Sequence, residues 1–119
     1  MRSSGSRPMP KASRLDDVAK RFLDQKLETI RREFAPTHLV VFGSRATGTA
    51  RADSDIDLII VSERFKDISV PNRPGHFLNT VWPDVPIDAI CYTPEEFETL
   101  TQKQWPFVRN AVKSGVRIE

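Results

Sequence analysis

The sequence of 119 residues has little of what marks secreted, membrane-spanning or strongly nucleic-acid-binding proteins. Its one cysteine, Cys91, excludes an internal disulfide and favours a reducing compartment, so we expect a cytoplasmic protein. No apolar run approaches the roughly 20 residues of a membrane-spanning helix, and we expect no membrane association. The 18 Lys and Arg residues against 16 Asp and Glu give a net charge of only +2, too small an excess to indicate nucleic-acid binding by itself.

The length is typical of one domain. The N-terminal stretch is rich in Ser, Gly, Pro and Arg and lacks the apolar region of a signal peptide. This composition predicts a flexible tail over residues 1–11, followed by a single domain over residues 12–119.

Helical and strand patterns alternate along the domain. Apolar residues recur every three or four positions up to Phe34, which predicts a first helix over Ser13–Phe34 with Ser13 and Asp16 as a capping box. Pro71, Pro74 and Gly75 predict a long polar loop over Ser62–His76. The whole pattern predicts an α+β fold, a small sheet with helices packed against it. The other expected elements are strands His38–Phe42, Ile56–Val61, Val85–Tyr92 and Val116–Ile118, and helices Phe77–Trp82, from Thr93 onward, and Pro106–Ser114.

Two aspartates, Asp55 and Asp57, stand one residue apart where the chain turns apolar, in "SDIDLII". Side chains alternate faces along a strand, so both carboxylates are expected on one face, with Cα atoms about 6.6 Å apart. Carboxylates this close repel each other and raise each other's pKa unless a cation lies between them. With Asp53 nearby, the segment predicts a site for a divalent cation, and hard cations prefer oxygen ligands.

Asp88 is the other carboxylate embedded in an apolar predicted strand, "VPIDAICY". Burying an unpaired carboxylate is costly, so we expect the strand to bring Asp88 beside Asp55 and Asp57. Three carboxylates can hold two metal ions roughly 3.5–4 Å apart, which suits in-line attack on phosphorus. The alternative is that Asp88 lies on an edge strand and faces water.

Gly43 and Ser44 leave the first predicted strand and lead into a turn. Glycine permits close backbone approach, and turn amides with a serine hydroxyl can bind phosphate oxygens. Arg45 and Arg51 are candidate charge partners for a triphosphate. Plainer roles compete with these: a turn without a ligand, and arginines that are simply exposed. Two alternatives also exist for the loop cations, which are either exposed surface residues or a cover over the triphosphate: Arg64, Lys66 and Arg73. Three aromatic residues either pack against the protein or stack on a base: Tyr92, Trp82 and Trp105.

The segment "GSRATGTARADSDIDL", from Gly43 to Leu58, resembles the signature of the polymerase-beta-like nucleotidyltransferase superfamily, Gly-Ser followed after a spacer by Asp-x-Asp. The third acidic residue of that signature is matched by Asp88. Within the superfamily the chain is most similar to the minimal nucleotidyltransferases of bacteria and archaea. Thr47 departs from the family pattern, in which arginine is common at this position and contacts phosphate.

The resemblance implies a nucleotidyltransferase fold, with a mixed sheet, and transfer of a nucleoside monophosphate from a nucleoside triphosphate to an acceptor hydroxyl. It implies Asp55, Asp57 and Asp88 as catalytic metal ligands for two Mg²⁺ ions, with Mn²⁺ as the alternative. Gly43 and Ser44, with Arg45, would bind the nucleotide, expected to be ATP. Asp88 would also help to deprotonate the acceptor hydroxyl.

The acceptor follows from the resemblance rather than from these residues. The stretch after Asp88 suffices for two short helices and a strand but not for an acceptor domain, so we expect a partner to supply that site. Minimal nucleotidyltransferases often pair with a helical HEPN-type protein as toxin and antitoxin and adenylylate it. A homodimer and a nucleic-acid acceptor are the alternatives for the partner. The alternative function is an antitoxin or regulatory module that keeps the fold but acts by binding.

Overall fold

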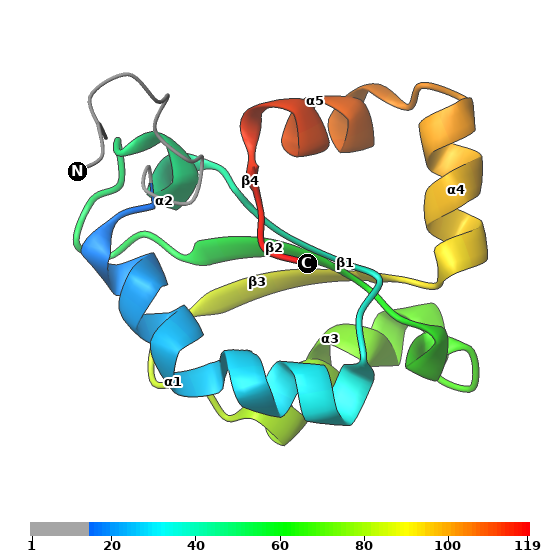
Figure 1. Cartoon of the computed structure of the whole chain (residues 1–119), viewed down its shortest axis with the longest axis horizontal. Coiled ribbons are helices and arrows are strands. Elements are labelled where there is room, and N and C mark those ends of the chain that lie inside the picture. The colour runs from blue at the N-terminus through cyan, green and yellow to red at the C-terminus, as the bar shows by residue number, and fades with distance from the viewer. Residues whose placement is uncertain (1–14) are drawn as a thin grey trace, which may run out of the picture.

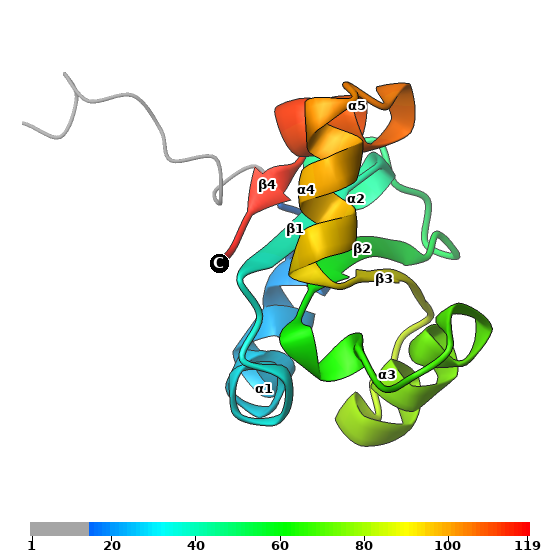
Figure 2. The same cartoon turned by 90° about the vertical axis from the view of Figure 1, so that its right-hand side faces the viewer.

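A four-stranded mixed sheet forms the centre of the molecule, with helices on both faces (Figure 1, Figure 2). The computed structural model describes residues 15–119, so the predicted tail 1–11 and the expected domain start at residue 12 lie outside the described residues. The predicted α+β class is confirmed. The helices are α1 (Asp17–Phe34), α2 (Ser44–Thr47), η3 (Glu63–Phe65), η4 (Val70–Asn72), α3 (Arg73–Val81), α4 (Pro94–Gln102) and α5 (Pro106–Ser114), and the strands are β1 (His38–Phe42), β2 (Ile56–Val61), β3 (Ile87–Tyr92) and β4 (Val116–Arg117).

The strand order in the sheet is β3-β2-β1-β4. Strand β1 pairs antiparallel with β2 and with β4, whereas β2 pairs parallel with β3. The register places Phe42 beside Asp57, and Asp57 beside Asp88. Because residues opposite each other in a sheet share a face, these three side chains form one row across three strands.

Side-chain alternation divides the apolar residues between two cores. Leu58 and Ile60 pack on the face covered by α1 and α3, while Ile59 and Val61 pack on the face covered by α4 and α5 (Figure 1). Asp57 therefore shares its face with α4 and α5, as the parity of the strand requires. Among residues 15–119, no helix combines the length and apolarity that a membrane span needs.

The first helix begins later than predicted. Asp16, not Ser13, is the N-cap of α1, because its Oδ1 atom accepts a hydrogen bond from the Ala19 N–H at 2.9 Å. Ser13 itself lies outside the described residues. The capping box predicted at Thr93 is confirmed: Thr93 accepts from the Glu96 N–H, and Glu96 accepts from the Thr93 N–H.

The predicted loop Ser62–His76 is wrong in part, because it holds two short 3₁₀ helices and the start of α3. Arg73 is not an exposed loop residue, because its side chain is buried. Its guanidinium donates hydrogen bonds to the carbonyls of Ile68 and Cys91 and, at 2.6 Å, to the Glu96 carboxylate. A buried arginine needs such partners, and it joins the segment before α3 to the end of β3 and the start of α4.

The Arg73–Glu96 ion pair should make stability depend on pH. The Arg73 hydrogen bond holds the pKa of Glu96 below its usual value of 4.5, so the pair stabilises the fold above that pH and loses its effect as Glu96 protonates. Glu96→Gln keeps the cap acceptor, and we expect it to lower the free energy of unfolding by about 0.5–1 kcal/mol at pH 7, because the Glu96 side chain is 39% exposed and solvent screens the pair. Urea unfolding at pH 7 and pH 3 checks this; an equal loss at both pH values would contradict it.

Candidate functional site

The candidate site begins where β1 ends, at Gly43. Its φ of 75° and ψ of −156° fall in a region that only glycine adopts readily. This conformation turns the chain sharply into α2, whose first residue is Ser44. No hydrogen bond within residues 15–119 occupies the Ser44 hydroxyl, which is half-buried. The turn therefore leaves the Ser44 hydroxyl available at the end of β1, while the carbonyls of Gly43 and Ser44 accept hydrogen bonds within the turn.

The carboxylate of Asp57 lies directly against Gly43. A Cβ atom added at Gly43 would overlap the Oδ2 atom of Asp57, so only glycine leaves room for this side chain. The predicted phosphate-binding turn and the predicted metal ligand thus occupy the same spot. A triphosphate held at Gly43 and Ser44 would face a carboxylate, and such a pair of negative groups requires a cation between them.

The three predicted carboxylates lie close enough at this end of the sheet for their charges to interact. Burial raises the pKa of Asp57, and the charges of Asp88 and then Asp55 raise it further. They do not form a finished metal site, because no group of three or more His, Cys, Asp and Glu in the described range surrounds one point. Carboxylate oxygens are nevertheless the ligands that a hard divalent ion prefers, so the chemistry of the three residues fits such an ion.

Arg45 is positioned differently from the prediction. Its side chain is buried, and its guanidinium donates to Asp16 at 2.9 Å and to the carbonyl of Ser54 at 2.8 Å. It also lies 3.4 Å from the Ala52 carbonyl. Arg45 therefore fixes the turn before Asp55 against the start of α1, and the structure gives no support to its predicted phosphate contact.

An aromatic pair next to the carboxylates was not predicted. Phe42 is the register partner of Asp57, and its ring meets that of Phe107 edge to face, with ring centroids 5.6 Å apart. Phe107 belongs to α5 and is 44% exposed. Phe42 reaches the site through the register of β1 with β2, and Phe107 through its ring contact with Phe42, so the sequence offered no local signal. Among the predicted stacking candidates, Tyr92 packs against Phe97, Trp82 follows α3 and Trp105 precedes α5.

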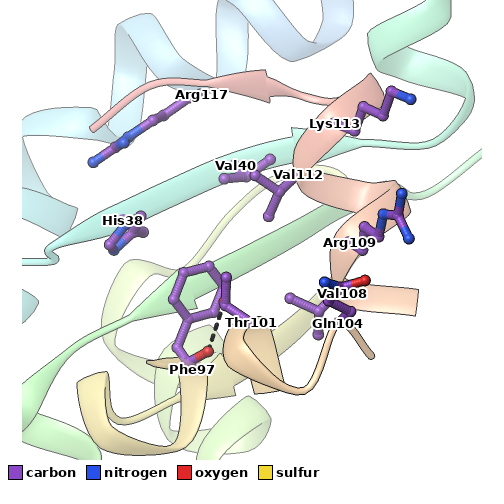
Figure 3. Close-up of a pocket in the computed structure, with 10 residues that line it drawn as sticks. All are labelled: His38, Val40, Phe97, Thr101, Gln104, Val108, Arg109, Val112, Lys113 and Arg117. Atoms are coloured by element: carbon purple, nitrogen blue, oxygen red, sulfur yellow. Dashed lines mark hydrogen bonds between the residues drawn. The ribbon is translucent and has the colours of Figure 1, made fainter. Parts of the chain in front are cut away.

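A cavity of about 490 Å³ lies on the same face of the sheet but away from the carboxylates (Figure 3). It reaches His38, the first residue of β1, whereas the candidate site lies beyond Phe42, the last. None of the predicted site residues lines it. The residues that line it are His38, Val40, Phe97, Thr101, Gln104, Val108, Arg109, Val112, Lys113 and Arg117.

The comparison with family models decides the class of protein. Residues 23–118 match the model of the nucleotidyltransferase domain, and this range includes all the predicted site residues. The chain belongs to the nucleotidyltransferase domain family. The predicted family is therefore confirmed, and the general activity of this nucleotidyltransferase domain is transfer of a nucleotidyl group. No curated protein matches the sequence.

Solved structures resemble this nucleotidyltransferase domain at low sequence identity. The BolA domain of SufE1 from Arabidopsis thaliana is 19% identical, with a TM-score of 0.50, over 69% of this chain and 98% of that one. BolA1 from the same plant is 18% identical, with a TM-score of 0.49 over the same shares. A Sulfolobus solfataricus protein assigned as a nucleotidyltransferase is 23% identical, with a TM-score of 0.47, over 79% of this chain and 83% of that one.

Proposed function

We propose that this nucleotidyltransferase domain transfers AMP from ATP to a hydroxyl group of a partner protein and releases pyrophosphate. The observation that carries the proposal is the contact between Asp57 and Gly43, which places a carboxylate at the turn suited to phosphate. Asp88, its register partner on β3, extends the acidic row toward the edge of the sheet. The family match supports nucleotidyl transfer, and this geometry supports the residue roles.

Each residue has a separate task in this proposal. The turn amides and hydroxyl at Gly43 and Ser44 bind the phosphate oxygens of the triphosphate. Asp55 and Asp57 would hold Mg²⁺, or Mn²⁺ in its place, because their carboxylate oxygens suit a hard divalent ion. Asp88 completes the ligand set and, being exposed, accepts the proton of the incoming hydroxyl. When bound, the ion lowers the pKa of the attacking oxygen and neutralises the charge on the leaving pyrophosphate.

The acceptor in the proposal is a separate protein, a helical HEPN-type partner as in toxin–antitoxin pairs. Asp88 is exposed, and its strand lies at the open edge of the sheet, so the hydroxyl of another chain can approach it. A homodimer that modifies its own second copy is the alternative arrangement.

Pyrophosphate release tests the proposal. The chain is incubated with ATP, Mg²⁺ and the protein encoded beside it, and pyrophosphate and the intact mass of both proteins are measured. We expect pyrophosphate in step with one added AMP per modified hydroxyl, and loss of both signals with EDTA. ADP and phosphate as products, or an unchanged mass of every acceptor tried, would contradict the proposal.

A further inference from the structure

An aromatic surface lies beside the candidate site, next to the turn that is suited to phosphate. Phe42 is half-buried, immediately precedes Gly43 and is the register partner of Asp57. The ring of Phe107 meets the Phe42 ring edge to face, at an interplanar angle of 85°. In such a pair the edge of one ring meets the face of the other, so flat ring surface remains uncovered. Phe107 accordingly keeps 44% of its surface exposed.

The packing of α5 fixes the position of Phe107. The next residue, Val108, and Ala111 one turn later are buried in the same cluster as Val40, on the face of the sheet that carries Asp57 (Figure 1). A side chain on a packed helix loses little freedom when a ligand contacts it, so stacking on this ring has a low entropic cost. A single exposed aromatic residue is ordinary on a protein surface, but this one is held beside a turn suited to phosphate.

The order of groups along the acidic row leaves one side of the site for the base of the nucleotide. The row runs from Asp88 on β3 through Asp57 on β2 to Phe42 on β1. In the proposed reaction the acceptor hydroxyl approaches Asp88, and the phosphates lie at Gly43, beside Asp57. The acceptor therefore needs the β3 side of the row. On the β1 side, the base meets the rings of Phe42 and Phe107.

We propose that the base of the nucleoside triphosphate stacks on Phe107, whose ring Phe42 supports; this inference rests on the proposed function. Phenyl rings carry no hydrogen-bonding group, so the contact responds to the area of the base rather than to the pattern of its edge. A purine has two fused rings and covers more of the phenyl face than a pyrimidine. The substrate class is therefore a purine nucleoside triphosphate, and Phe107 is the residue that sets this preference.

Two probes separate binding of the base from binding of the phosphates. One is the ATP analogue in which a methylene group replaces the oxygen between the α- and β-phosphates, so it binds without being cleaved. The other is tripolyphosphate, which has no base. Titration calorimetry with Mg²⁺ measures both affinities. Phe107→Leu keeps an apolar contact with Phe42 but has no aromatic face, whereas Phe107→Trp keeps one, and thermal melts without ligand compare the folds of the two variants.

The expected result is a loss confined to the probe that has a base. Phe107→Leu should weaken binding of the ATP analogue about tenfold and change that of tripolyphosphate less than about twofold, and Phe107→Trp should retain the affinity for the analogue. The matching UTP analogue should bind the unaltered chain several-fold more weakly than the ATP analogue, and Phe107→Leu should remove most of that difference. Equal losses for the ATP analogue and tripolyphosphate would overturn the inference, because they would mean that Phe107 only supports the phosphate turn.

Steady-state rates distinguish failure of this inference from failure of the proposed function. With ATP and the acceptor protein, Phe107→Leu should raise KM about tenfold and leave kcat close to that of the unaltered chain, because stacking holds the base equally in the bound and transition states. Pyrophosphate release with an unchanged KM in Phe107→Leu would overturn the base contact while leaving the proposed function intact. Absence of pyrophosphate release with every acceptor, together with no binding of either probe, would remove both.

Discussion

Asp57→Asn is expected to lower AMP transfer by about a thousandfold, equivalent to about 4 kcal/mol of transition-state stabilisation, while the fold stays intact. Asparagine keeps the shape of the side chain but loses the charge that would hold a divalent ion beside Gly43. The same change should raise the melting temperature of the protein in EDTA by a few degrees. The reason is that Asp57 lies in a partly buried position whose neighbours Asp88 and Asp55 disfavour its charge.

Asp53→Asn is the matched control for this prediction. Asp53 is exposed and lies two residues before Asp55. The Asp53→Asn substitution therefore also removes one negative charge, from the turn just before β2. We expect transfer within about twofold of the unaltered chain, because an exposed charge outside the row is screened by solvent and salt. Single-turnover transfer rates and thermal melts of both variants supply the comparison. Equal losses in the two variants would mean that net charge, not the position of Asp57, matters.

Gly43→Ala is expected to damage both activity and stability. Its backbone lies in a region that costs other residues about 1–3 kcal/mol, and the new methyl group would overlap the Asp57 carboxylate. Displacement of that carboxylate by about 1 Å should lower transfer about a hundredfold. Urea unfolding and transfer rates measured on the same preparation separate the two effects.

Gly48→Ala separates backbone strain from the clash. Gly48 also has a positive φ, 81°, but a Cβ there meets nothing within 4 Å. We expect it to cost about 1–2 kcal/mol of stability while transfer remains close to that of the unaltered chain. A Gly43→Ala variant that transfers AMP as fast as Gly48→Ala would show that the Asp57–Gly43 contact has no catalytic role.

The start of β2, where Asp57 lies, was predictable because its sequence signals are local. Alternation predicts Asp55 and Asp57 on one face. The apolar run predicts the strand, and in the structure β2 begins at Ile56, so Asp57 lies in the strand and Asp55 just before it. The expectation that β3 lies beside β2 also holds, and the register brings Asp88 level with Asp57. The direction of pairing was not predictable, because it depends on how the connections between strands pack rather than on the strands themselves.

The arginines show where sequence reasoning fails. Arg73 and Arg45 follow turn residues and look like exposed or ligand-binding cations, yet both are buried. Their partners, Glu96 and Asp16, lie 23 and 29 residues away in the sequence. A buried arginine whose acidic partner comes from a distant element meets that partner only in the folded chain, so neither residue carries a local signal. The same holds for Phe107, which reaches the site only through its contact with Phe42.

The central claim is that the Asp57–Gly43 contact serves transfer of a nucleotidyl group, and labelled ATP tests it most directly. Two parallel reactions with the partner protein and Mg²⁺ contain ATP labelled at the α-phosphate or at the γ-phosphate. We predict that the acceptor gains the α label and none of the γ label, that the γ label appears in pyrophosphate, and that Asp57→Asn removes the α label. An acceptor that carries the γ label, or α labelling unchanged by Asp57→Asn, would contradict the account.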